Sequence, residues 1–266
     1  MKILNIRMIK PVLHYFNLAD EVVSFSTTRH GGVSKGKLAT LNINPHRGDE
    51  PSAVAENLQA VAAEIGVQAD KVIRLHQIHE TDCLTVTDAF FHLSAAEQYE
   101  MEEGKDAIVT DCRNVCIGVH TADCVPVLFY DPVHHAIGAA HAGWRGTVQR
   151  IAQHTLRKMI ELYGTDPKEL KAVVGPCISL KNFEVGQEVY DAFSAAGFPM
   201  ERIARMYEKW HIDLPLCNQF QLEELGVPAA NILQSGICTY DNASDFFSAR
   251  ILKEGFGTIY TGIALK

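Results

Sequence analysis

Apolar positions along the chain follow two periodicities, one typical of buried strands and one typical of amphipathic helices. Short apolar runs rich in β-branched residues predict strands over 21–28, 71–76, 83–87, 136–141, 171–175, 231–239 and 256–264. Apolar residues spaced three and four apart predict helices over 52–65, 147–163, 186–196 and 215–225. This alternation, uninterrupted by a Pro/Gly/Ser-rich linker, predicts an α/β (mixed α+β) fold with mixed β-sheets flanked by helices.

The centre of the chain, 115–130, is apolar but interrupted by the tetrapeptide TADC. Gly118 and Pro126 disfavour one continuous helix, so two buried strands around a bend are expected there. Residues 91–105 are polar and are expected to form a surface excursion. The whole chain, 1–266, is expected to be a single domain with an N-terminal extension over 1–20.

Composition and charge exclude several classes of protein. The chain is 47% hydrophobic and carries a net charge of −8, which disfavours non-specific nucleic-acid binding. No run of 18 apolar residues and no signal peptide is evident, so we expect no membrane partner and a cytoplasmic location. Seven cysteines, an odd number, fit a reducing compartment in which thiols are free or bound to metal.

Three segments place possible metal ligands where predicted strands end: HQIH (76–79), TADC (121–124) and HAGWRG (141–146). Histidine nitrogen and cysteine thiolate are natural zinc donors, and a catalytic zinc site needs three of them plus an open position. The alternative is structural, because a buried cysteine often acts as a small hydrophobe and histidines commonly serve as hydrogen-bonding residues. The spacing leaves both interpretations open, since no local CxxC pair is involved.

Two arginines are candidates for binding an anion. Arg29 lies in the TTRHGGVS loop, where Gly31 and Gly32 permit either a plain turn or a backbone cradle for an anion. Arg145 lies within GWRG, just before a predicted helix N-terminus, which also favours anions.

Several motifs occur together and in a fixed order: TTRHGGVSKGKLATLNI, LHQIH, TADCVPVL, HAGWRGT, GPCI, FEVG, SGICT and FFSAR. In this combination the sequence resembles the laccase-domain (multicopper polyphenol oxidase-like) family from about residue 20 to the C-terminus. Members of that family carry purine nucleoside phosphorylase, adenosine deaminase and peptidoglycan editing factor names. The resemblance therefore implies phosphorolysis of adenosine, inosine, guanosine and methylthioadenosine, together with deamination of adenosine.

By position, the resemblance places the zinc ligands on His79, Cys124 and His141, with His76 as a neighbouring decoy. Copper is the less favoured metal, because the paired HxH motifs of a laccase are absent. Arg29 and Arg145 are then candidates for binding phosphate or ribose. Asp123 is either a proton shuttle or a residue that orients a zinc histidine. The expected partners are a nucleoside and phosphate.

Two other functions remain open at this point. Cys124 could be a metal-free nucleophile activated by His141, because a toxin deamidase family with a related fold uses such a pair. The chain could instead edit peptidoglycan precursors. Metal dependence distinguishes the first alternative, and the preferred substrate distinguishes the second.

Overall fold

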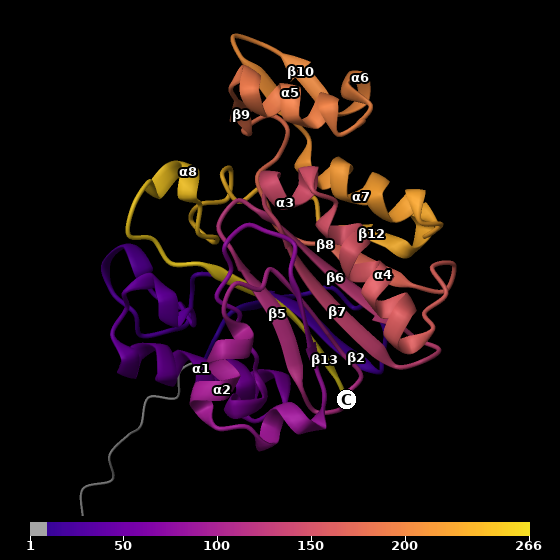
Figure 1. Ribbon diagram of the computed structural model, residues 1–266. Coiled ribbons are helices and arrows are strands. Elements are labelled where there is room, and N and C mark those ends of the chain that lie inside the picture. The colour runs from indigo at the N-terminus through magenta and orange to yellow at the C-terminus, as the bar shows by residue number, and fades with distance from the viewer. Residues whose placement is uncertain (1–9) are drawn as a thin grey trace, which may run out of the picture.

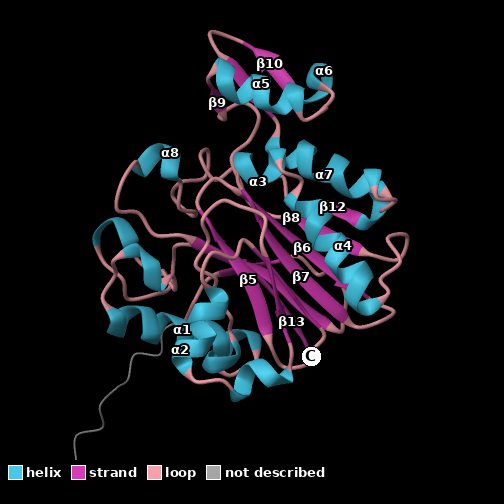
Figure 2. Ribbon diagram, viewed as in Figure 1, coloured by secondary structure: helices cyan, strands magenta, loops and turns pink. Residues whose placement is uncertain are grey.

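The computed structural model describes residues 10–266, in which two central sheets are covered by helices on their outer faces (Figures 1 and 2). The four-stranded sheet has the order β1-β2-β13-β5, formed by Leu13–Tyr15, Val22–Thr27, Ile259–Leu265 and Cys116–Thr121. The six-stranded sheet has the order β12-β8-β6-β7-β4-β3, formed by Ile232–Gln234, Lys171–Val174, Val125–Asp131, Ala136–Ala142, Ala107–Thr110 and Cys83–Val86.

The helices vary in length from one turn to four. They are α1 (Pro51–Ile65), α2 (Ala95–Glu102), α3 (Trp144–Val148), α4 (Ile151–Tyr163), α5 (Gln187–Ala195), α6 (Met200–Ile203), α7 (Leu214–Glu224) and α8 (Ala249–Leu252). Within residues 10–266, none of them is long and apolar enough to cross a membrane.

The sheets stack because their strands are apolar on both faces. Along β6, Val127 and Phe129 pack towards α4, whereas Leu128 and Tyr130 pack between the two sheets. On the other side, α1 covers the outer face of the four-stranded sheet, where its Val61 packs in one cluster with residues of that sheet. The result is a helix–sheet–sheet–helix arrangement, which confirms the predicted mixed α/β fold.

A small third sheet lies outside this stack. Strands β10 (Ala204–Met206), β11 (Trp210–Ile212) and β9 (Glu184–Val185) pair in the order β10-β11-β9. Together with α5 and α6 they project from one end of the molecule (Figure 1). These strands have two or three residues each, too short to give a periodic signal in the sequence.

Most predicted elements are present, and the central pair β5 and β6 does flank a bend at 122–124. The strand predicted over 71–76 is wrong: this segment makes only isolated bridges, from Val72 to Cys116 and from His76 to Glu103, so its apolar residues are buried without a continuous ladder. The helix predicted over 147–163 is interrupted at Arg150, whose φ of 66° is left-handed, and α4 begins only at Ile151. The excursion over 91–105 contains α2, which begins with a capping box between Ser94 and Glu97.

Candidate metal centre

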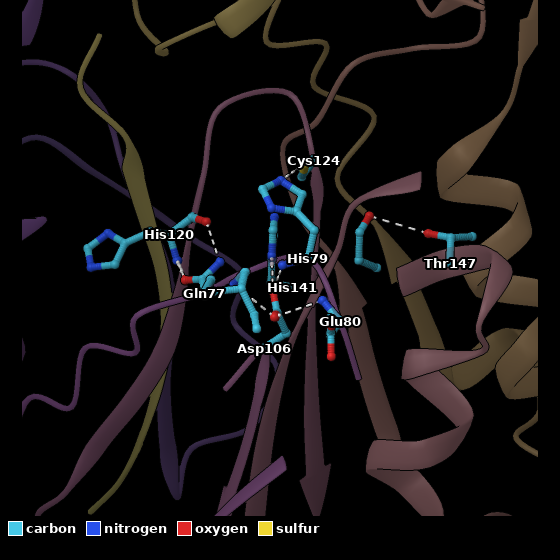
Figure 3. A network of polar contacts seen from close by, with 10 residues as sticks. Gln77, His79, Glu80, Asp106, His120, Cys124, His141 and Thr147 are labelled. Carbon is cyan, nitrogen blue, oxygen red and sulfur yellow. Dashed lines mark hydrogen bonds and ion pairs between the residues drawn. The ribbon is translucent and has the colours of Figure 1, made fainter. Parts of the chain in front are cut away.

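Three side chains converge at one end of the sheet stack. His79 lies in the loop before β3, Cys124 in the bend between β5 and β6, and His141 near the end of β7 (Figure 3). Their ligand atoms all lie within 4.8 Å of one another, and Cys124 Sγ is 3.9 Å from His79 Nε2. The structure therefore brings together the trio that the resemblance selected, although the three come from distant parts of the sequence.

A buried carboxylate, Asp106, fixes two of the three ligands. Its Oδ1 is 2.6 Å from His141 Nδ1, and the same carboxylate accepts the backbone N–H groups of Ile78, His79 and Glu80 (Figure 3). His79 has a left-handed φ of 68°, a conformation that costs a non-glycine residue roughly 1–3 kcal/mol. Three N–H donors on one carboxylate offset that cost and hold the loop under His79 in place.

The hydrogen bond from Asp106 also decides which nitrogen of His141 is free. A carboxylate can only accept, so Nδ1 donates to it and Nε2 faces Cys124 and His79. Charged His141 and hydrogen bonds from both histidines lower the pKa of the Cys124 thiol, although burial alone would raise it. Conversely, the Cys124 charge and Asp106 raise the pKa of His141 against the effect of its burial. Both shifts favour a thiolate beside an imidazolium in the absence of metal, which is also the charge state that a cysteine nucleophile uses.

The donor set fits a metal ion. One thiolate and two imidazoles, one of them backed by a carboxylate, match the ligands and the supporting hydrogen bond of three-ligand zinc sites. The backbone leaves room for the cluster at Gly143: a Cβ there would lie 3.0 Å from His79 and 3.1 Å from Cys124 Sγ. Glycine at this position therefore keeps the space between the ligands open.

Asp123, the expected shuttle or orienter, contacts neither histidine. Its carboxylate accepts the Thr239 and Ser248 hydroxyls and the Arg250 backbone N–H, at 2.7–3.0 Å. It thus ties the bend carrying Cys124 to the C-terminal loops. The orienting role is held by Asp106, 17 residues earlier in the sequence.

A cavity of about 260 Å³ opens beside the cluster. Its lining includes the trio and polar residues from four stretches of the chain: Asn44, His46, Arg47, His76, Gln77, His120 and Thr258. Arg47 stacks on Phe256, with its guanidinium carbon 4.3 Å from the ring centroid, and its Nε donates to the Phe256 carbonyl. Its terminal nitrogens make no hydrogen bond to any residue between 10 and 266, so they remain available to an anion.

The two arginines singled out from the sequence lie elsewhere. Arg29 donates to the backbone carbonyls of Ala39 and Ala243 and stacks on Phe247, so it braces loops. Arg145 is exposed and lies over Trp144. Neither is among the residues that line the cavity, counting the described part of the chain.

Sequence reasoning missed Asp106 and Arg47. Asp106 had one available signal, an aspartate immediately before an apolar strand that ends up fully buried. Arg47 had none, because it stands in the short 3₁₀ turn Pro45–Arg47 inside a polar loop. Arg47 comes close to the metal ligands only because its loop folds against the segment that contains Phe256.

The sequence matches known proteins over nearly its whole length. The family described as multi-copper polyphenol oxidoreductase laccase matches residues 23–266. A protein of Bacteroides thetaiotaomicron named purine nucleoside phosphorylase is 41% identical, over 96% of this chain and 97% of its own. Adenosine deaminase RL5, from an unknown prokaryotic organism, is 36% identical over 96% and 98%.

The fold matches solved structures equally well. The Bacillus licheniformis protein YfiH superposes with a TM-score of 0.90 at 30% identity, covering 98% of both chains. YlmD from Geobacillus stearothermophilus gives a TM-score of 0.87 at 29% identity, covering 94% of both. The chain therefore belongs to the multi-copper polyphenol oxidoreductase laccase family.

Proposed function

We propose that this protein is a zinc-dependent purine nucleoside phosphorylase that acts on adenosine, inosine, guanosine and methylthioadenosine and also deaminates adenosine. The observation that carries the proposal is the His79–Cys124–His141 trio on the wall of a cavity that also presents the terminal guanidinium nitrogens of Arg47, which bond no residue between 10 and 266. The names of the relatives, purine nucleoside phosphorylase and adenosine deaminase, support the same reactions.

The lining offers a suitable partner for the phosphate and another for the ribose of the nucleoside. Arg47 would bind phosphate oxygens, because a stacked guanidinium with free N–H groups suits that geometry. His120 is almost fully buried, and its Nε2 has no partner within residues 10–266. Burial and the nearby charge of Arg74 lower the pKa of His120, so it stays neutral and can hydrogen-bond a ribose hydroxyl.

The trio would hold zinc, with Asp106 fixing His141 and the 78–80 loop. Bound zinc would supply a Lewis acid next to the sugar or base and would lower the pKa of a water for deamination. The residues themselves contribute orientation: Asp106 fixes the His141 ring, and the Gln77 side chain pairs with both backbone groups of His120 at 2.7–2.8 Å.

The test uses purified protein and two measurements. Elemental analysis should give near-stoichiometric zinc, and incubation of each nucleoside with phosphate should release the free base and the 1-phosphate of its sugar. Adenosine without phosphate should give inosine. Zinc with none of these products would contradict the proposal and direct the substrate search to cell-wall precursors.

A second candidate, a metal-free cysteine hydrolase, is favoured by one observation: the lowered pKa of Cys124 beside a charged His141. Chelation separates the two functions. Activity that disappears with a chelator and returns with zinc excludes the metal-free nucleophile, whereas activity that survives complete metal removal establishes it.

A further inference from the structure

A second imidazole–carboxylate pair lies beside the same cavity, apart from the metal cluster. His76 lines the cavity, and its Nδ1 is 2.5 Å from the Glu103 carboxylate. Glu103 is the residue directly after α2, the helix of the polar excursion. Backbone hydrogen bonds join the same segments, from His76 N to the Glu102 carbonyl and from Gly104 N to the His76 carbonyl. The end of α2 is therefore fixed against His76.

The plane of the His76 ring is also fixed. The His46 imidazole stacks on it with a centroid separation of 4.1 Å and an interplanar angle of 16°. Tyr99 of α2 lies 6.1 Å from His46. We call His46, His76 and Glu103 the histidine cluster. The two rings come from separate segments, the 3₁₀ turn Pro45–Arg47 and the loop before β3, and the end of α2 packs against both.

The hydrogen bond to Glu103 determines the chemistry available to His76. An ionised carboxylate only accepts, so Nδ1 keeps its hydrogen and the exchangeable proton is on Nε2. The side chain is 36% exposed and lines the cavity, so substrate and solvent can reach it. Within residues 10–266, the other ionisable groups near this cluster include Tyr99, Arg74, Arg47 and His120, and Glu102 faces Arg74.

Phosphorolysis of a purine nucleoside needs such a proton donor. When the bond between ribose C1′ and purine N9 breaks, its electron pair stays on the base, which leaves far more readily once a proton has been added. Among the cavity-lining residues, His79, Cys124 and His141 are committed to one another, with Asp106 bound behind His141, and His120 is kept neutral by burial. His76 is the imidazole with a carboxylate partner and a free edge.

We infer that His76 is the general acid that protonates the leaving purine at N7, and that Glu103 is the residue that positions it; this inference rests on the proposed phosphorylase function. A phosphate oxygen forms the new bond to C1′ as the C1′–N9 bond breaks. The Nε2 proton passes to N7, leaving neutral His76. The hydrogen that monohydrogen phosphate loses on becoming the ester dianion restores the proton, so atoms and charge balance.

The test compares two substrates of the wild type and of His76→Gln. Inosine needs a proton on N7 to leave as a neutral base, whereas 7-methylinosine already carries a positive charge there and does not. With saturating phosphate, His76→Gln should reduce kcat on inosine by about 10²–10³-fold and leave kcat on 7-methylinosine within a few fold. Equal losses on both substrates would overturn the inference.

Glu103→Gln is the second variant and should reduce kcat on inosine about 10-fold with little change in KM, again sparing 7-methylinosine. Glu100→Gln, on the exposed face of the same helix, and His92→Gln, in the preceding 3₁₀ segment, are the matched controls and should behave as wild type. A Glu103→Gln loss that appears only in KM would contradict a positioning role. Wild-type protein that cleaves neither nucleoside in phosphate would instead refute the phosphorylase function itself.

Discussion

Two clusters that contribute histidines to the cavity lining are built in opposite ways. In the metal cluster (His79, Cys124, His141 and Asp106), one fully buried carboxylate holds two ligands and three consecutive backbone amides. In the histidine cluster, half-exposed side chains on a turn and a loop are held by one carboxylate and one ring stack. Rigid support suits coordination of an ion in fixed geometry, whereas an exposed, adaptable pair suits a substrate that enters and leaves.

The largest expected effect comes from removing the thiolate of the metal cluster. Cys124→Ser should lower bound zinc to background and reduce phosphorolysis and deamination by at least about 10³-fold, because a hydroxyl is a poor zinc ligand. Elemental analysis and product assays measure both. Cys112→Ser, at another half-buried free cysteine, is the control and should keep metal and activity. A Cys124→Ser protein that is inactive but fully metallated would favour the nucleophile instead.

Next comes the support beneath the metal cluster, tested by two buried aspartates. Asp106→Asn would place amide hydrogens against N–H donors and should lower zinc affinity about 10–100-fold and the free energy of unfolding by about 3 kcal/mol. Asp123→Asn should cost about 2 kcal/mol of stability by weakening its contacts with Thr239 and Ser248. Because Asp123 contacts neither histidine, zinc affinity should stay at the wild-type value. Zinc titration and urea unfolding measure the two quantities, and equal zinc affinities in both variants would contradict the assignment.

The same contrast explains what the sequence could predict. Buried strands such as β6 and β7 have a strong apolar pattern, so the fold was accessible, and TADC and HAGWRG lie at their ends. The spacing of these motifs left the metal site open, and the trio was selected by the family resemblance. The role of Asp123 was not accessible, because sequence adjacency to Cys124 says nothing about where a residue with φ of 85° directs its carboxylate. The interruption at Arg150 was hidden for a related reason, since the apolar stripe continues across it.

The histidine cluster and Arg47 were inaccessible for a different reason. His76 meets Glu103 across 27 residues, and Arg47 meets Phe256 across 209, through loops without periodicity. Such contacts depend on how the loops pack against the folded sheets. Polar residues in loops also carry no pattern that separates a cavity lining from a solvated surface.

A smaller effect should follow from changing the guanidinium next to the histidine cluster. Arg47→Gln should raise the KM for phosphate about 10-fold while zinc content stays unchanged, because one charge-assisted contact to the anion is lost. Initial rates at varied phosphate measure it. Arg145→Gln, at the exposed arginine outside the cavity, is the control and should leave the KM unaltered. If Arg145→Gln raised the KM for phosphate and Arg47→Gln did not, the phosphate would instead bind at Arg145, one of the two arginines proposed from the sequence.

The smallest effect concerns pH, where Glu102, next to the histidine cluster, and Asp106, in the metal cluster, should respond in opposite directions. Burial raises the pKa of Glu102, beside Glu103, to about 7, against the opposing charge of Arg74. A folded-state pKa above the unfolded value means that the folded protein binds more protons between pH 4.5 and 7, so stability falls as pH rises through that window. Glu102→Gln should remove about 1 kcal/mol of this decline, a figure reduced for the group's partial exposure.

Asp106 should give the opposite slope in the metal-free protein. Burial alone would raise the pKa of Asp106, but hydrogen bonds from His141 and the 78–80 loop lower it below the usual value. The contribution of Asp106 to folding stability is therefore complete above the pKa of the unfolded chain and is lost as the pH falls through the folded-state pKa. Urea unfolding from pH 3 to 8 in the presence of chelator measures both. Glu102→Gln should flatten the plot of unfolding free energy against pH between pH 4.5 and 7 and leave the part below pH 4.5, the acid limb, unchanged. A variant that altered only the acid limb would show that the end of α2 is coupled to the metal cluster rather than independent of it.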